Sequence, residues 1–509
     1  MLANVALLLA AVWLAIPALA RMVGLLLYPY AVDGLEGTLL YEARLWRSGA
    51  ALYQPLERFG FVSAPYPPVS YLALMLFDMI PGPHVFFGGR LVSFLAALAV
   101  AALIAIMVRR AGGAWGAGAL AAALLLSAPP LQLWGTRIKP DVLALCFTTL
   151  GLLFAADTID QNPHRADSST TLRDYSRLFA QRRGQQTAFT IARAMALPAV
   201  CFALAFFTKQ TAVAGALAFG IALLVADWRG TGALRGWLAR PLIFALCYLA
   251  LTLGAWALLD LATGRMYTQH VWWNFARGGW WSPILFWRIV GLLTFWLPLL
   301  PIALLSLWVA RERRAALLPA CYLLMVPISL LGAGEEGAHH NHLLETHTAL
   351  ALCGGIAIGW CVASLPRRLW LALPAAGLLA LQLWLAPQPP AWYAGQLAPS
   401  DPPDRYLAFL RATPGEVLGD DTGLLFQAGK DLRYNDPSTM GPAARSGLWD
   451  QSGLLEDIAN QKFTAIMIPT DATTADRSSS GRWTPEMLAA IRQHYRLLYR
   501  DTLNTFVPR

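Results

Sequence analysis

The sequence is poor in charged residues. Asp, Glu, Lys and Arg make up only 14% of its 509 residues, whereas 57% of the residues are hydrophobic. Soluble domains carry about 25% charged residues. A larger core does not explain the deficit, because the cores of soluble domains stop growing near roughly 300 residues. A bilayer that acts as a second solvent does explain it, so the composition predicts a membrane protein.

Cysteine is also scarce, and no cysteine lies in a loop. The six cysteines fall inside apolar runs, at Cys146, Cys201, Cys247, Cys321, Cys353 and Cys361. This placement excludes a disulfide framework, and the spacing is not that of a zinc site. We interpret these cysteines as small hydrophobic residues of the core.

Apolar runs of about 17 to 25 residues are candidates for membrane spans. About eleven occur, near 4–27, 86–108, 113–130, 141–156, 191–208, 211–226, 241–259, 285–309, 315–332, 343–364 and 369–386. The run 69–80 is too short to cross a membrane, and we expect it to lie against the bundle. The first run lacks a basic flank and is followed by further spans, which favours an uncleaved span over a signal peptide.

The net charge of +9 does not indicate a nucleic-acid partner, because the basic residues are dispersed among apolar segments and form no stripe. They indicate orientation instead, since cytoplasmic loops are rich in Lys and Arg. With the N-terminus inside, every inside connection is basic. The residues concerned are Arg109, Arg110, Arg165, Arg173, Arg177, Arg182, Arg183, Arg229, Arg235, Arg240, Arg311, Arg313, Arg314, Arg367 and Arg368. The sequence thus predicts a bacterial inner-membrane protein with a cytoplasmic N-terminus.

Two units are expected along the chain. Residues 1–386 form the transmembrane domain, which includes a long first outer loop at 28–85. An odd number of spans places residues 387–509 outside, as a small periplasmic α/β domain that begins with the Pro-rich stretch APQPPAW. The segments GEVLG, TAIMIP, HYRLLYR and NTFVP are expected as short strands. Thr484-Pro485-Glu486 predicts the start of a helix.

The first outer loop predicts an amphipathic helix lying at the membrane surface. Its apolar residues are Leu35, Leu39, Ala43 and Trp46, and its polar residues are Glu36, Arg44 and Arg47. Gly49 is the expected stop. Asp33 and Glu36 stand at its start in a capping-box pattern, in which Asp33 is the N-cap and Glu36 reaches back to it. The alternative is a carboxylate at the mouth of a membrane cavity, where it could act as a general base.

Four basic residues occupy the predicted outer ends of spans: Arg90, Arg137, Lys139 and Lys209. Arg binds phosphate through paired hydrogen bonds. Any one of these side chains could instead reach the lipid headgroups. Because all four lie on the same side as the acidic loop, they favour a site that binds phosphate.

The densest polar cluster lies in the outer connection 333–342 and at the start of the next span. It contains Glu335, Glu336, His339, His340, His342 and Glu345. A divalent metal on His340, His342 and Glu336 is one interpretation, although the spacing is not that of a standard closed site. Hydrogen bonding to substrate and a solvated loop are the others. Glu345 falls inside a span, where an ionisable residue is costly. In the Trp-rich loop 260–284, His270 and Asn274 would share a helical face.

Several short motifs follow one another along residues 1–365. They are Asp33-Gly34-Leu35-Glu36-Gly37, Ser48-Gly49, Tyr66-Pro67-Pro68 before Tyr71, Gly89-Arg90-Leu91, Lys139-Pro140-Asp141, Thr208-Lys209-Gln210-Thr211, and Asn341 four residues before Glu345. In this order and on this common side of the membrane, they resemble the polytopic GT-C glycosyltransferases. The resemblance is strongest to the bacterial branch near the protein O-mannosyltransferases and lipid A aminoarabinose transferase.

This resemblance implies that a sugar passes from a polyprenyl phosphate, on the outer leaflet, to an acceptor glycan, lipid or protein. A first-loop carboxylate removes the proton of the acceptor hydroxyl, and the anomeric carbon inverts as the lipid phosphate leaves. The reaction needs positive charge around that phosphate and requires no cofactor. We expect substrate contacts from Tyr66, Arg90, Arg137, Lys139, Asp141, Lys209, Gln210, His270, Asn341 and Glu345.

The sequence departs from the aminoarabinose-transferase pattern at two places. That pattern has adjacent Asp and Glu, whereas here Asp33 and Glu36 are three positions apart. Asp33 matches the leading acid and is favoured as the base. The pattern also has a Lys before Pro-Pro that contacts phosphate, whereas here Tyr66 occupies that position. Another cation must therefore take its role.

Two other functions compete with glycosyl transfer. A transporter or lipid flippase usually shows inverted repeats and broken helices near the midplane. This sequence shows no repeat, and its polar residues gather at one face. The other alternative is an assembly protein without catalytic activity, in which the C-terminal domain is a binding module. That function would be favoured if Asp33 and Glu36 were both dispensable.

Overall fold

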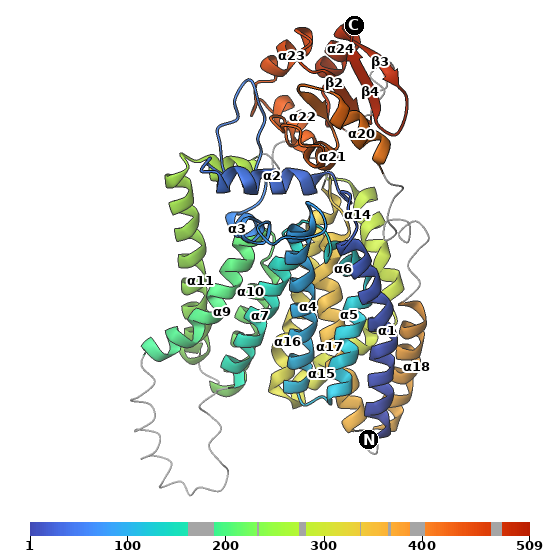
Figure 1. The fold of residues 1–509 in the computed structure, drawn as a ribbon. Coiled ribbons are helices and arrows are strands. Elements are labelled where there is room, and N and C mark those ends of the chain that lie inside the picture. The colour runs from blue at the N-terminus through green and yellow to red at the C-terminus, as the bar shows by residue number, and fades with distance from the viewer. Residues whose placement is uncertain are drawn as a thin grey trace, which may run out of the picture.

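The computed structural model describes residues 1–160, 188–231, 234–273, 281–335, 337–364, 368–386, 403–469 and 481–509. Long helices run side by side in a bundle, and a small domain with a β-sheet caps one end (Figure 1). The N-terminus lies at the opposite end of the bundle from this domain. The predicted polytopic helical fold with a C-terminal α/β domain is therefore confirmed.

Each of the eleven predicted apolar runs falls on helical segments. These are α1 (Leu2–Leu26), α4 (Phe87–Arg110), α5 (Trp115–Ser127), α7 (Asp141–Asp160), α9 (Ala188–Thr208), α10 (Ala214–Thr231), α11 (Leu234–Ala262), α14 to α15 (Pro283–Val290, Gly291–Trp296 and Leu299–Glu312), α16 with η4 (Leu317–Met325 and Val326–Gly334), α17 (Leu344–Ala363) and α18 (Leu369–Leu385). Within the described ranges, six helices are long and apolar enough to cross a membrane. A seventh is added if the pair Pro283–Trp296 and Leu299–Glu312, bent by 77°, counts as one span. The predicted number of spans is not confirmed.

Small residues allow close packing in the bundle. The bundle core is mostly Ala, Leu and Val from these helices. A Cβ on Gly355 of α17 would lie 2.6 Å from Ala121 of α5, and one on Gly359 would lie 2.8 Å from the Cα of Gly113. Helices in lipid associate largely through such close contacts, because lipid offers no hydrophobic drive for association.

The predicted helix of the first loop is present as α2 (Leu35–Arg47), and Gly49 follows it with φ +96°. It lies across the ends of the bundle helices, beneath the C-terminal domain (Figure 1). Its apolar residues Leu39 and Ala43 are buried against α3 (Pro68–Phe77) and its neighbours. Its polar residues Thr38 and Glu42 are buried as well. Of the predicted polar residues, Arg44 and Arg47 are 39% and 38% exposed, whereas Glu36 is buried. The C-terminal domain covers part of the polar side of α2 as well, which the sequence did not indicate.

The C-terminal domain contains the predicted strands. These are β1 (Val417–Gly419), β2 (Ala465–Ile468), β3 (Tyr495–Tyr499) and β4 (Asn504–Pro508). The sheet order is β1-β2-β4-β3, with β1 parallel to β2 and the other pairs antiparallel. Its helices are α20 (Asp404–Ala412), α21 (Thr422–Gln427), α22 (Pro437–Arg445), α23 (Ser452–Ala459) and α24 (Pro485–His494). Thr484 caps α24 as predicted, accepting a hydrogen bond from the Met487 amide. Residues 387–402, which hold most of the expected linker, lie outside the described residues.

Candidate active site

Glu36 and Arg90 form an ion pair with fully buried side chains between α2 and α4. The Glu36 carboxylate accepts from Arg90 Nε at 3.0 Å and from Arg90 Nη2 at 2.7 Å. It also accepts from the amides of Val32 at 2.9 Å and Ile138 at 3.1 Å. Each oxygen thus receives two hydrogen bonds, which fills the usual capacity of a carboxylate. Glu36 therefore links Val32, Arg90 and Ile138, which lie on three different segments of the chain. Neither of its oxygens is left free to bind a substrate.

Arg90 holds the chain that follows α1. Its guanidinium donates to the carbonyls of Leu25 at 3.2 Å, Tyr28 at 2.5 Å and Tyr30 at 2.5 Å. With the two bonds to Glu36, the donors of this side chain are engaged by protein atoms. The sequence suggested Arg90 as a phosphate ligand. In the structure, Arg90 instead donates to backbone carbonyls of the loop that carries Asp33.

Asp33 lies differently, with its side chain 22% exposed. Its Oδ1 accepts from the Leu35 amide at 2.9 Å and lies 3.5 Å from Lys139 Nζ, while its Oδ2 lies 3.4 Å from Arg137 Nη1. Both acids bond nearby amides, as a capping role requires, but Gly34 is the N-cap of α2 and receives no side-chain cap. Burial raises the pKa of Asp33, but Lys139, Arg137 and the Leu35 amide outweigh it and lower this pKa to about 2.

Arg137 and Lys139 come from the turn between α6 (Pro129–Trp134) and α7. The Ser93 hydroxyl fixes this turn by donating to the Arg137 carbonyl at 2.7 Å. Their side chains are only 11% and 8% exposed, so neither reaches out to headgroups. Arg137 Nε is buried without a hydrogen-bond partner. Two cations face one carboxylate here, and within the described residues neither has another acid at ion-pair distance. The site thus carries surplus positive charge.

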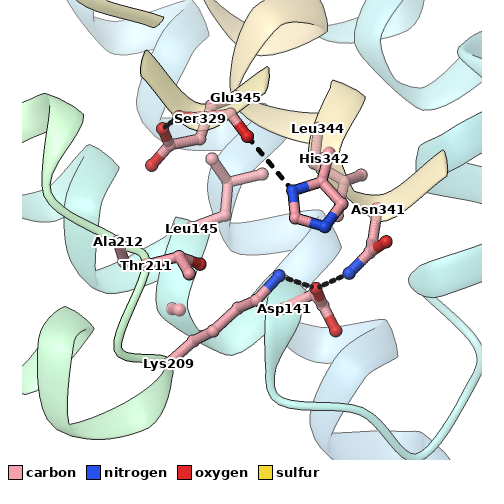
Figure 2. A pocket seen from close by; sticks show the side chains of 11 residues that line it. Asp141, Leu145, Lys209, Thr211, Ala212, Ser329, Asn341, His342, Leu344 and Glu345 are labelled. Carbon is pink, nitrogen blue, oxygen red and sulfur yellow. Dashed lines mark hydrogen bonds and ion pairs between the residues drawn. The ribbon is translucent and has the colours of Figure 1, made fainter. Parts of the chain in front are cut away.

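A second polar group lies beside the first, around an open pocket of about 370 Å³. Asp141, at the start of α7, accepts from Lys209 Nζ at 2.5 Å and from Asn341 Nδ2 at 2.8 Å (Figure 2). The polar residues of the lining are Asp141, Lys209, Thr211, Ser329, Asn341, His342 and Glu345. The predicted candidates Asp141, Lys209, Asn341 and Glu345 are therefore brought together from α7, the α9–α10 turn, the short helix η5 (His340–Leu343) and α17.

Most of the polar atoms of this pocket accept hydrogen bonds. His342 Nδ1 lies 3.1 Å from the Ser329 carbonyl, so Nδ1 carries the proton and Nε2 is an acceptor. Asn341 Oδ1 is buried without a partner. The Glu345 carboxyl accepts from the Ser329 hydroxyl (Figure 2). A pocket rich in acceptors, with one ammonium, suits a ligand that carries several hydroxyl groups. Ser329 is a pocket residue that the sequence analysis missed, and a lone Ser within an apolar run was its only signal.

Tyr66 lies near acids of both groups. Burial, and then the charges of Asp141 and Asp33, raise the pKa of Tyr66 well above its usual value. The Tyr53 hydroxyl donates to the Tyr66 carbonyl at 2.9 Å, just before Pro67 and Pro68 open α3. The Pro-Pro motif therefore holds a neutral phenol near both acids, at the position where the related pattern has a Lys.

His270 bonds backbone groups of the first outer loop, and Gln210 bonds the backbone of Val271, the residue after His270. His270 Nδ1 accepts from the Ala64 amide at 3.0 Å, and His270 Nε2 lies 2.7 Å from the Gln54 carbonyl. Burial lowers the pKa of His270 to about 4, against the effect of the Gln54 bond. Gln210 Nε2 donates to the Val271 carbonyl at 3.2 Å. Neither residue lines the pocket, and Asn274 lies outside the described residues.

Replacing His270 with Phe tests this supporting role. The variant leaves the Ala64 amide and the Gln54 carbonyl unpaired in a buried place, at a cost of about 1–3 kcal/mol for each group. We expect a lower midpoint of thermal unfolding in detergent. An unchanged midpoint together with weaker substrate binding would instead make His270 a substrate ligand.

The outer connection 333–342 contains the histidines of the metal hypothesis. In the parts of the chain that the structure describes, no three His, Cys, Asp or Glu side chains are grouped to hold an ion. The His340 ring packs on Trp134 and on His339, and His342 belongs to the pocket. Glu336, the third residue of the metal hypothesis, lies outside the described residues. The metal hypothesis for His340, His342 and Glu336 therefore stays a prediction.

No family model matches this chain, and no curated protein matches its sequence. Its fold does match solved structures. ArnT from Cupriavidus metallidurans, bound to undecaprenyl phosphate, has a TM-score of 0.56 at 15% identity, over 97% of each chain. The oligosaccharyltransferase AglB from Archaeoglobus fulgidus, in complex with an inhibitory peptide and a dolichol-phosphate, has 0.50 at 12% identity, over 100% of this chain and 74% of that chain. The mycobacterial arabinofuranosyltransferase AftD has 0.50 at 18% identity, over 97% and 41%. All are polytopic GT-C glycosyltransferases, so the fold that the sequence resemblance implied is confirmed.

Proposed function

We propose that this GT-C-fold chain is an inverting glycosyltransferase of a bacterial inner membrane. It transfers a sugar from a polyprenyl-phosphate donor to an acceptor hydroxyl on the periplasmic face. The observation that carries the proposal is a partly exposed carboxylate, Asp33, held beside two cations with spare hydrogen-bond donors. The structural neighbours ArnT and AglB were solved with undecaprenyl phosphate and a dolichol-phosphate, which supports a lipid phosphate as the donor's leaving group.

Asp33 is the general base in this proposal. We assign the role to Asp33 rather than to Glu36, because Arg90 and two amides already bond both oxygens of Glu36. The Asp33 carboxylate instead is partly exposed and lies beside Arg137 and Lys139. It takes the proton of the acceptor hydroxyl while the acceptor oxygen bonds to the anomeric carbon. The bond from that carbon to the phosphate oxygen breaks, and the lipid phosphate leaves with the electron pair.

Arg137 and Lys139 are the phosphate ligands in this proposal. Among the four candidate cations, Arg90 is neutralised by Glu36 and Lys209 by Asp141. Only the pair at Asp33 carries a surplus charge, and Arg137 Nε still lacks an acceptor. A phosphate bound there would draw the two cations away from Asp33. The pKa of Asp33 would then rise from its low value, which makes the carboxylate a better base once the donor is bound.

The pocket of Asp141, Asn341, His342 and Glu345 would hold the sugar. Sugar hydroxyls can donate to the free acceptors of Asn341 and His342 and to the Glu345 carboxyl. Lys209 Nζ can donate to a ring or hydroxyl oxygen. No step of this reaction calls for a metal, because side-chain cations stabilise the leaving phosphate.

Binding of undecaprenyl phosphate tests the assignment of the phosphate ligands. Lys139→Met removes half of the cation pair, and we expect its Kd for undecaprenyl phosphate to rise about tenfold or more, since hydrogen bonds to charged groups contribute about 1.5–3 kcal/mol. The matched control combines Lys209→Met with Asp141→Asn, which removes a cation and its neutralising partner together. It should change this Kd by less than about threefold. A larger loss in the control than in Lys139→Met would move the phosphate to Lys209.

A further inference from the structure

The C-terminal domain touches α2 through its backbone. A Cβ added to Gly37 would lie 2.3 Å from the carbonyl oxygen of Thr422, the first residue of α21. Only a glycine permits this approach. Figure 1 shows α21 directly over α2. The domain therefore docks on the helix that follows Asp33, and it does so without an intervening layer of side chains.

Thr422 reaches the peptide that follows Asp33. Its hydroxyl donates to the Gly34 carbonyl at 2.5 Å and lies 2.7 Å from the hydroxyl of Thr38. Thr422 is 1% exposed and Thr38 is 0% exposed, so water does not compete for these bonds. A Cβ on the next residue, Gly423, would lie 3.5 Å from the carbonyl oxygen of Asp33. The C-terminal domain thus bonds the backbone of Gly34, the residue that follows Asp33, and leaves no room for a larger residue than glycine at position 423.

Asn435 makes a second connection. Its Nδ2 donates to Glu42 Oε1 at 2.8 Å, its Oδ1 accepts from the Ser63 amide at 2.9 Å, and its carbonyl accepts from Thr38 at 2.6 Å. It is fully buried. One side chain of the C-terminal domain therefore ties α2 to the segment that leads to Tyr66.

These contacts matter because the hydrogen bonds that Asp33 accepts come from adjacent residues, the amides of Leu35 at 2.9 Å and Glu36 at 3.0 Å, and do not tie it to the bundle. Its two ion pairs are single contacts of 3.4 and 3.5 Å, and the residues between α1 and α2 form no helix or strand. Arg90 holds this stretch from the bundle side, through the carbonyls of Tyr28 and Tyr30. Thr422 holds it from the opposite side, through Gly34.

We propose that the C-terminal domain is part of the catalytic apparatus, with Thr422 and Asn435 as positioning residues for the base. The inference rests on the proposed function, in which Asp33 is that base. A displacement of about 1 Å at a reacting group can cost about 100-fold in rate. The hydroxyl of Thr422 is therefore expected to affect the chemical step rather than the binding of the donor.

The test compares Thr422→Val with Thr422→Ser in the full chain, using the donor that wild type turns over. Thr422→Val removes the hydroxyl at nearly constant volume, and we expect kcat to fall about tenfold or more. The donor KM should stay within about twofold. The unfolding midpoint should fall, because the Gly34 carbonyl loses a buried hydrogen bond, so kcat is measured well below the midpoints of both variants. Thr422→Ser restores the donor to Gly34 and should recover kcat to within about twofold of wild type. Tyr41→Phe is the matched control, because it removes another hydroxyl bond of the same interface, from Tyr41 to Asp431 at 2.7 Å. It should leave kcat unchanged.

Three results would overturn the inference: wild-type kcat in Thr422→Val, an equal loss of kcat in Tyr41→Phe, or a loss that Thr422→Ser does not recover. Asp33→Asn in the same assay separates this failure from that of the proposed function. If Asp33→Asn abolishes transfer while Thr422→Val is unchanged, only the positioning role fails. If Asp33→Asn retains wild-type transfer, the base assignment itself is wrong.

Discussion

Replacing Asp33 with Asn should reduce the rate of glycosyl transfer about 100- to 10,000-fold, the range that general-base catalysis contributes. The amide keeps the size of the side chain but cannot accept the proton of the acceptor hydroxyl. Donor binding should survive or improve, because the amide releases Arg137 and Lys139 for the phosphate. The rate of transfer and the Kd for undecaprenyl phosphate, measured on one preparation, check both parts.

The pH dependence provides an independent check on Asp33. Its pKa is lowered to about 2 in the free protein, so the carboxylate stays ionised at every pH above that value. The profile of kcat/KM, which reports the free enzyme, should therefore show no loss from this group as the pH falls from 8 towards about 4. If Asp33→Asn transfers sugar at the wild-type rate, Asp33 is not the general base.

Glu36→Gln should act mainly on stability. It leaves the Arg90 guanidinium buried without its counter-charge, and breaking a buried pair in this way costs about 3–5 kcal/mol. The Gln amide also presents a donor where the carboxylate received hydrogen bonds from Arg90 and from two amides. We expect a clearly lower unfolding midpoint in detergent and a low yield of folded protein.

Combining Glu36→Gln with Arg90→Met separates the contribution of the ion pair to stability from the contacts that each residue makes with other groups. The double variant removes the stranded charge, so its loss of stability should be smaller than the sum of the two single losses. If Glu36→Gln has the wild-type midpoint but no longer transfers sugar, Glu36 rather than Asp33 is the general base.

The fold was largely predictable because its signals are local. Runs of apolar residues mark helices, the spacing of Leu35, Leu39 and Ala43 marks α2, and Thr484-Pro485 marks the start of α24. The order of short motifs led to the GT-C fold that the structural neighbours share. Each helix signal depends on neighbours within a few residues along the chain, and each motif is short, although the order of the motifs extends over residues 1–365.

The roles within the site depend on contacts between distant segments, which the sequence does not reveal. Glu36 and Asp33 look alike as acids at a helix start, and only the pairing of Glu36 with Arg90 separates them. Likewise, Arg137 and Lys209 are similar cations until Asp141 is found beside Lys209. His270 was suggested as a substrate ligand, but its nitrogens bond a loop some 200 residues earlier in the chain.

The C-terminal domain shows the same limit. Its strands could be predicted, but no local pattern indicated that Thr422 and Asn435 would meet α2 across nearly 400 residues. The amphipathic pattern of α2 fits a helix at a membrane surface as well as one buried beneath a domain. That pattern gives no sign of the contacts that Thr38 and Glu42 make with the C-terminal domain.

The most direct test of the central claim is the release of polyprenyl phosphate. The purified protein would be incubated in detergent with a panel of polyprenyl-phosphate sugars and candidate acceptors, beside Asp33→Asn, and the lipid products identified by mass spectrometry. The proposal predicts that wild type converts one donor to free polyprenyl phosphate with transfer of its sugar, and that Asp33→Asn does not. If every donor stays intact while the protein moves lipid-linked sugars between the leaflets of proteoliposomes, the chain is a flippase and the proposed function is contradicted.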